Sequence, residues 1–247
     1  AQRVGVTPSN RPTWQVVWMP VLWLVGVAVC AIAAPYLGLT DPDDVVLERS
    51  LSEPGLSFWF GADAAGRDVF SRTLHGSRTL FTCLVAGLLL GFGFSAALRT
   101  VERLYPRTGH SLARLSHRIA QVCPPLLLMT AAIVVWDSSY FTIALSLALF
   151  FPSFVLTVNQ EEEPSDDLRR PGVFAFLAMA ITTVSTVSFM RLGPPADVAG
   201  WGAAVSYGQE HFQYAPHISL GPAAILVVTT LAIIIIADRL TATSPGR

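Results

Sequence analysis

The sequence predicts an all-α integral membrane protein with six transmembrane helices. Hydrophobic residues make up 52% of the 247 residues and charged residues only 13%, about half of the roughly 25% that is usual in soluble domains. The apolar residues gather into six stretches, each close to the roughly twenty residues that a helix needs to cross a bilayer. The formal net charge of −1 excludes nucleic-acid binding driven by a basic surface.

The six apolar stretches are separated by polar loops and define the expected helices. They cover residues 14–37, 79–98, 119–136, 140–158, 172–190 and 217–237. Pro124 and Pro125 fall near the start of the third stretch, where the first turn of a helix tolerates proline. We expect a cytoplasmic tail over 1–13, one membrane domain over 14–237, and a second cytoplasmic tail over 238–247.

The arginines predict the orientation of these helices. The chain has sixteen arginines and no lysine, and eleven of the arginines lie in segments that share one side of the membrane: 1–13, 99–118, 159–171 and 238–247. Cytoplasmic loops of membrane proteins are enriched in basic residues. Both termini are therefore expected in the cytoplasm, and the segments 38–78 and 191–216 outside.

The most informative polar segment, residues 58–78, precedes the second apolar stretch. A glycine-rich turn is followed by an amphipathic helix in which Asp68 and Arg72 have the i,i+4 spacing of an ion pair. The simplest interpretation is a solvated connecting helix with surface ion pairs. If this helix instead packs on the following span, Arg67 and Arg72 are expected to hold it there through Asp63 and Asp68.

The wording of this segment resembles the inner-membrane permease subunits of ATP-driven (ABC) importers for dipeptides, oligopeptides and nickel. The residues that match the family motif keep its spacings, and they are Gly61, Asp63, Gly66, Arg67, Asp68, Ser71, Arg72, Gly76 and Arg78. Ala62 and His75 stand where the family usually has threonine and tyrosine. A second match, in the loop before the last stretch, consists of Gly193, Pro194, Pro195, Trp201 and Gly202.

The resemblance implies a permease fold with an external amphipathic helix before the second span, in a bacterial inner membrane. It implies transport of peptides or of nickel and other metal chelates. The partners it implies are the lipid bilayer, a second permease subunit, two ATPase subunits and a solute-binding protein. The family's permeases bind no nucleotide themselves, so no cofactor is expected.

One region departs from the family pattern. Between the fourth and fifth stretches, these permeases carry a Glu-Ala-Ala motif on a short helix that docks into the ATPase. Here the interval 159–171 contains Glu161, Glu162 and Glu163 without the alanine pair, and Pro164 interrupts any helix. We therefore expect degenerate ATPase coupling. The alternative is a permease-derived structural subunit that does not transport and belongs to another membrane complex.

Other chemistries find little support in the sequence. It has no nucleophile beside a base, no phosphate-binding loop with a lysine and no metal-ligand spacing, so we expect neither catalytic nor metal-binding residues. The acidic run from Asp41 to Glu48 lacks the pattern of a calcium loop and is expected to be a solvated turn. An ion-driven carrier is disfavoured because the stretches carry no charged residue away from their ends. All five histidines lie in loops or at stretch ends, which disfavours a haem or chlorophyll protein.

Overall fold

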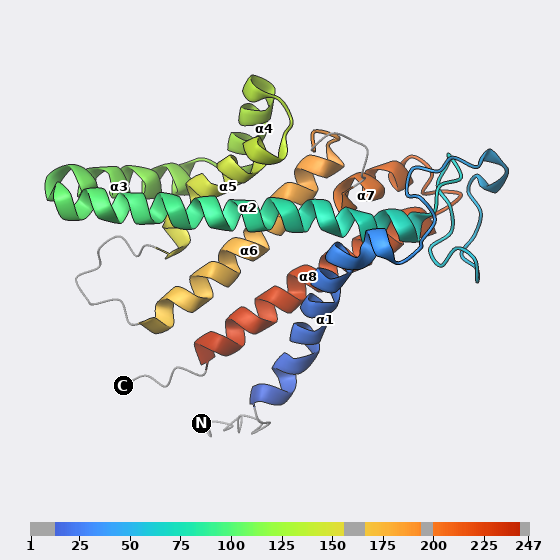
Figure 1. Cartoon of the computed structure of the whole chain (residues 1–247), viewed down its shortest axis with the longest axis horizontal. Helices are drawn as coiled ribbons and strands as arrows, with labels where there is room; N and C mark the ends of the chain where they lie inside the picture. Colours follow the sequence, from blue (N-terminus) through green and yellow to red (C-terminus); the bar gives the residue numbers. More distant parts are fainter. Residues whose placement is uncertain (1–12, 156–165, 194–199, 243–247) are drawn as a thin grey trace, which may run out of the picture.

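The computed structural model describes residues 13–155, 166–193 and 200–242, and within these ranges its named elements are all helical (Figure 1). The α-helices are α1 (Thr13–Ala33), α2 (Val69–Leu104), α3 (Pro106–Val122), α4 (Pro125–Trp136), α5 (Tyr140–Val155), α6 (Asp166–Phe189), α7 (Trp201–Gln209) and α8 (His217–Ala242). Two 3-10 turns, η1 (Ala34–Tyr36) and η2 (Leu47–Arg49), lie in the first long loop. The all-α membrane class predicted from the sequence is confirmed.

Within the described residues, four helices are long and apolar enough to cross a membrane: α1 extended by η1, α2, α6 and α8. The bent pair α3 and α4 would make a fifth. α5 has 16 residues, fewer than the roughly twenty that span a bilayer, and the rest of its expected stretch lies outside the described residues. The count of six spans stays a prediction.

The expected third span is not one straight helix. α3 ends at Val122, α4 begins at Pro125, and the two are bent by 99°. Pro124 disfavours the α conformation at the residue before it, and Cys123 is accordingly extended, with φ −92° and ψ 114°. Pro125 then occupies the first turn of α4, as the sequence predicts. The proline pair therefore breaks the helix as well as starting one.

The expected amphipathic helix and the second span form one continuous helix. α2 runs for 36 residues, which corresponds to about 54 Å, whereas the hydrocarbon core of a bilayer is about 30 Å thick. The segment 69–104 has no proline to break it. α2 therefore reaches well beyond one bilayer core, and the motif residues of its first turns share a rigid body with the span.

α2 packs mainly against α5 through small residues placed every four positions: Cys83, Gly87, Gly91 and Ser95, all buried. A Cβ added at Gly91 would lie 2.5 Å from Cβ and Cγ of Phe151, and one at Gly87 would lie 3.0 Å from Leu147. Such stripes let two helices approach closely inside a membrane. The α2–α5 contact therefore depends on missing side chains.

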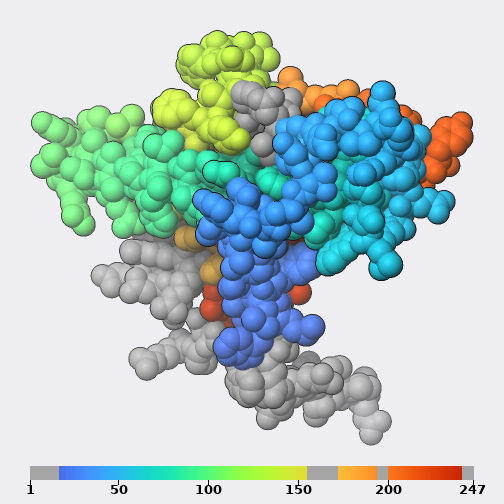
Figure 2. Space-filling model, turned by 45° about the vertical axis from the view of Figure 1, so that its right-hand side comes forward, coloured from blue at the N-terminus to red at the C-terminus, as the bar shows by residue number. Residues whose placement is uncertain are grey.

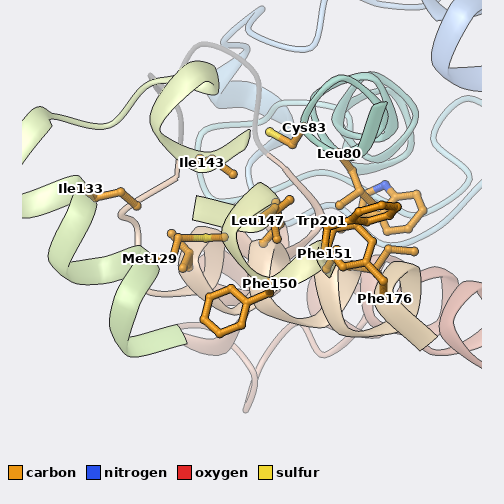
Figure 3. Close-up of a cluster of buried hydrophobic side chains, with 14 of the residues drawn as sticks. Leu80, Cys83, Met129, Ile133, Ile143, Leu147, Phe150, Phe151, Phe176 and Trp201 are labelled. Atoms are coloured by element: carbon orange, nitrogen blue, oxygen red, sulfur yellow. The ribbon is translucent and has the colours of Figure 1, made fainter. Parts of the chain in front are cut away.

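The largest cluster of buried apolar side chains lies where α2, α4, α5, α6 and α7 meet (Figure 3). Phe151 and Phe176 are fully buried, and their rings meet edge to face with centroids 4.9 Å apart. Trp201, from α7, projects into the same cluster beside Leu80 and Phe151. The second motif thus contributes to the core.

The start of α1, the start of α6 and the end of α8 lie at one end of the molecule, whereas the loop 38–68, α7 and the start of α2 lie at the other (Figure 1). We call the latter the loop end. Figure 2 shows the loop as a raised lobe beside α1. α6 begins at Asp166, so the last part of the turn expected over 159–171 is helical, because this helix starts before the apolar stretch.

Candidate functional site

The glycine-rich part of the first motif folds into a tight turn just before α2. Gly61 and Gly66 have φ values of +74° and +76°, a left-handed conformation that costs little only for glycine. A Cβ at Gly66 would also lie 1.8 Å from the carbonyl oxygen of Val46. The amide of Asp63 donates to the carbonyl of Arg67 across the turn at 3.0 Å. Both glycines are therefore required by the backbone.

Asp63 is the centre of this turn and is 5% exposed. Its Oδ1 accepts hydrogen bonds from the amides of Ala65 at 2.9 Å and Arg67 at 3.0 Å. Its Oδ2 accepts from Nε of Arg67 at 2.8 Å and lies 4.0 Å from Nε of Arg72. One buried carboxylate thus holds the turn closed and offsets the charge of two arginines.

The next two motif residues fasten the long loop onto α2. The side chain of Arg72 is 4% exposed, and its Nη1 donates to the carbonyl of Pro42 at 2.8 Å and to Oδ1 of Asp43 at 3.1 Å. Ser71 Oγ donates to the carbonyl of Thr40 at 2.5 Å. These contacts do not fit a solvated connecting helix, because the motif side chains are buried under the loop.

Asp68 caps α2. Its carboxylate accepts a hydrogen bond from the amide of Phe70 at 2.9 Å, which satisfies one of the free amides of the first turn. Burial raises the pKa of the Asp68 carboxyl above its ordinary value, and hydrogen bonds from the amides of Phe70 and Ser71 offset part of the rise. The i,i+4 pair expected between Asp68 and Arg72 is replaced by this cap and by the contacts of Arg72 with Asp43 and Asp63.

Trp201 joins the second motif to the first. It is 2% exposed, and its Nε1 donates to the carbonyl of Thr73, on α2, at 2.8 Å. Next to it, a Cβ at Gly202 would lie 1.8 Å from the carbonyl oxygen of Ser185, so glycine lets α7 approach α6. Trp201 and Gly202 therefore place α7 between α2 and α6.

Tyr207, on α7, bridges the two motifs electrostatically. The guanidinium of Arg67 lies 5.7 Å from the centre of its ring and that of Arg191 lies 4.6 Å from it, both within the range of cation–π attraction. Arg191 also forms an ion pair with Glu210. We call Asp63, Arg67, Arg191, Tyr207 and Glu210 the motif cluster.

The remaining predicted site residues fall in two groups. Gly76 is buried and Arg78 exposed on α2, and the carbonyl of Gly193 accepts a hydrogen bond from Ser138 Oγ. Pro194, Pro195, Glu161, Glu162 and Glu163 lie outside the described residues.

Sequence reasoning did not assign Asp43 or Glu210 to this site. Asp43 was expected in a solvated turn, and its partner Arg72 is 29 positions away. Glu210 lies three residues after Tyr207 on α7, a spacing that places both on one helix face. That spacing was the only available signal.

The motif cluster is built for holding rather than for reaction. Its arginines lie beside carboxylates and a tyrosine ring, so its charges are paired. Within the part of the chain that the structure describes, no group of three or more His, Cys, Asp or Glu residues could hold a metal ion. The arrangement fixes the loop, the start of α2 and α7 to one another.

We expect Trp201→Phe to weaken this attachment. The ring volume is largely kept, but the hydrogen bond to the Thr73 carbonyl is lost, which typically costs about 1–2 kcal/mol. The melting temperature of the purified protein in mild detergent measures this loss. Trp18→Phe is the matched control, since Trp18 is 57% exposed. Equal effects of the two substitutions would contradict the assigned role of Trp201.

Comparison with known proteins gives a consistent result. The chain is 26% identical to the glutathione transport system permease protein GsiD of Escherichia coli O1:K1 / APEC, over 89% of this chain and 82% of the relative. It is 25% identical to the GsiD proteins of Shigella boydii and Pectobacterium atrosepticum, again over 89% of this chain and 82% and 83% of theirs. No protein-family model matches the chain. The chain is thus homologous to importer permeases, and that part of the resemblance is confirmed.

Proposed function

We propose that this chain is the permease subunit of an ATP-driven (ABC) importer of peptides. The observation that carries the proposal is the hydrogen bond from Trp201 to Thr73, which joins two permease-like motifs across 128 positions. The similarity to glutathione permeases over most of both chains supports small peptides as the substrate class. Nickel chelates, the other class that the resemblance implies, enter the test below as a second substrate.

The proposed setting is a bacterial inner membrane, with residues 14–237 as the membrane domain and both termini cytoplasmic. The start of α1 and the end of α8 lie at the same end of the molecule (Figure 1), which supports this orientation. The loop end then faces outward, where a solute-binding protein would deliver the substrate. The other proposed partners are a second permease subunit and two ATPase subunits.

We also propose that ATPase coupling through this chain is degenerate. The interval between α5, which ends at Val155, and α6, which begins at Asp166, is where the family carries its coupling helix. Its sequence contains Glu161–Glu163 and Pro164 in place of that motif. The second permease subunit would then make the principal contact with the ATPases.

The composition of the native complex tests the proposed function. Purification from membranes in mild detergent, followed by mass spectrometry, should recover this chain with a second permease and two ATPase subunits. ATP hydrolysis by the complex should rise when the solute-binding protein and either a peptide or a nickel chelate are added. Recovery of the chain in another assembly without ATPases would overturn the transporter and leave the structural role.

A further inference from the structure

α3 presents three distinct faces along its 17 residues. The first packs against α2 and α5 and includes the buried residues Gly109 and Ala113. A Cβ at Gly109 would lie 2.2 Å from Cα of Glu102, so α3 and the end of α2 touch backbone to backbone. Figure 1 shows the two helices side by side, with α4 turning sharply away.

The second face is apolar and exposed. It consists of Leu112, Leu115, Ile119 and Val122, which are 40%, 54%, 42% and 78% exposed. Their spacings of three and four residues place them on one stripe of the helix. Large apolar side chains in such a stripe are stabilised when they leave water, at roughly 25 cal/mol per Å² buried.

The third face is cationic and adjoins the apolar stripe. Arg107, Arg114 and Arg118 are exposed, and at about 100° per residue their stripe lies roughly a quarter-turn from the apolar one. The helix itself, Pro106–Val122, contains no Asp or Glu. Glu102, the nearby acid on α2, pairs with His110 at 2.7 Å. The arginine stripe therefore has an uncompensated positive charge.

We propose that α3 lies in the plane of the membrane surface, with its apolar stripe among the acyl chains and its arginines on the phosphates of anionic phospholipids. An apolar stripe flanked by arginines is the arrangement by which helices bind in the interface. The 99° bend before α4 lets the chain turn from the surface into the bilayer. In the proposed orientation this surface is cytoplasmic, where anionic lipids attract basic segments.

This assignment explains why the expected third span is broken. Arg114 and Arg118 precede the apolar residues of α4, and carrying them into the hydrocarbon core would cost about 2.5–3.5 kcal/mol each. An in-plane helix keeps both at the phosphate level. The same lipid then covers the apolar stripe and neutralises the arginines.

Membrane depth along α3 tests the geometry. Single cysteines replace Ser111, Leu112, Arg114, Leu115, Arg118, Ile119 and Val122, one at a time, in a full-length chain lacking Cys30, Cys83 and Cys123. Each carries a nitroxide, and its collisions with oxygen and with a water-soluble nickel chelate are measured in phosphatidylglycerol vesicles. We expect labels at 112, 115, 119 and 122 to lie about 5–10 Å below the phosphates and labels at 111, 114 and 118 to contact water.

Two other patterns would overturn the proposal. A depth that increases steadily from 111 to 122 would make α3 the beginning of a transmembrane span. Low access of the labels at 115 and 119 to both reagents would mean that a protein partner, and not lipid, covers the apolar stripe. Neither pattern bears on whether the complex imports peptides, so the two proposals fail separately.

Lipid retention tests the chemistry of the arginine stripe. After purification from mixed vesicles, the chain should retain phosphatidylglycerol in preference to phosphatidylcholine. Replacing Arg107, Arg114 and Arg118 together by Gln should reduce that preference several-fold, since each surface arginine contributes about a fivefold effect. Arg78→Gln, at an exposed arginine of α2, is the control. An unchanged preference in the triple variant would exclude anionic lipid as the ligand of this stripe.

Discussion

Replacing Asp63 by Asn is expected to destabilise the protein more than any other single change in the motif cluster. The carboxylate is 5% exposed and binds two amides and Arg67, with Arg72 at 4.0 Å. Removing one partner of a buried ion pair typically costs 3–5 kcal/mol, because the remaining charge stays buried. We expect about 3 kcal/mol, since Arg67 keeps a side-chain exposure of 21%. For a chain of this size, that is a drop of roughly 6–12 °C in melting temperature.

Two further substitutions make the Asp63 result specific. Asp43→Asn also removes a partner of Arg72, but the Asp43 side chain is 47% exposed, so we expect no more than about 1 kcal/mol. Glu48→Gln, at an exposed acid of the same loop, should have no measurable effect. If Asp63→Asn and Asp43→Asn lower the melting temperature equally, the motif aspartate is not the anchor of the turn.

Gly91→Ala is expected to have the second largest effect. Its new Cβ would lie 2.5 Å from Cβ and Cγ of Phe151, so α2 and α5 must separate or Phe151 must leave its place in the core. Overpacking of this kind costs about 1–3 kcal/mol. Because α2 also carries the first motif, the displacement should reach the loop end.

Gly93 offers a matched control on the same helix. A Cβ added there meets nothing within 4 Å, and alanine is the better helix former by about 1 kcal/mol. Gly93→Ala should therefore be neutral or stabilising, while Gly91→Ala destabilises. Melting temperatures measured in the same detergent give the comparison. Loss of stability in both variants would point to a general requirement for glycine in α2 and not to the α5 contact.

The helical class and both motifs could be predicted because they depend on local sequence. Composition marks the chain as membrane-embedded, and Gly61 and Gly66 mark a turn whose backbone only glycine accommodates easily. The position of Pro125 at the start of α4 follows from the chemistry of proline in the same way.

The pairing of residues far apart in the chain could not be predicted. The charge pattern favoured Asp68 as the partner of Arg72, because the two are four residues apart, but the loop brings Asp43 to Arg72 from 29 positions away. Nothing in the local sequence indicates that Trp201 reaches the Thr73 carbonyl. The 99° bend was missed because the apolar run continues across Pro124, and hydropathy alone does not reveal a change of direction.

The motif cluster also suggests how the loop end could take part in transport. Arg67 belongs to the body that contains α2, whereas Tyr207 and Glu210 belong to α7. Any motion of α7 relative to α2 must change the two cation–π contacts and the buried Trp201 hydrogen bond. A substrate or a binding protein shifts such an equilibrium only by contacting the two arrangements differently.

ATP-dependent uptake by the purified complex is the most direct test of the proposed permease function. The complex is reconstituted in proteoliposomes with its solute-binding protein, and accumulation of radiolabelled glutathione is followed with and without ATP. We predict accumulation that requires ATP and falls when Asp63→Asn replaces the native chain at equal incorporation. A complete, ATP-hydrolysing complex that accumulates neither glutathione nor other small peptides would contradict it.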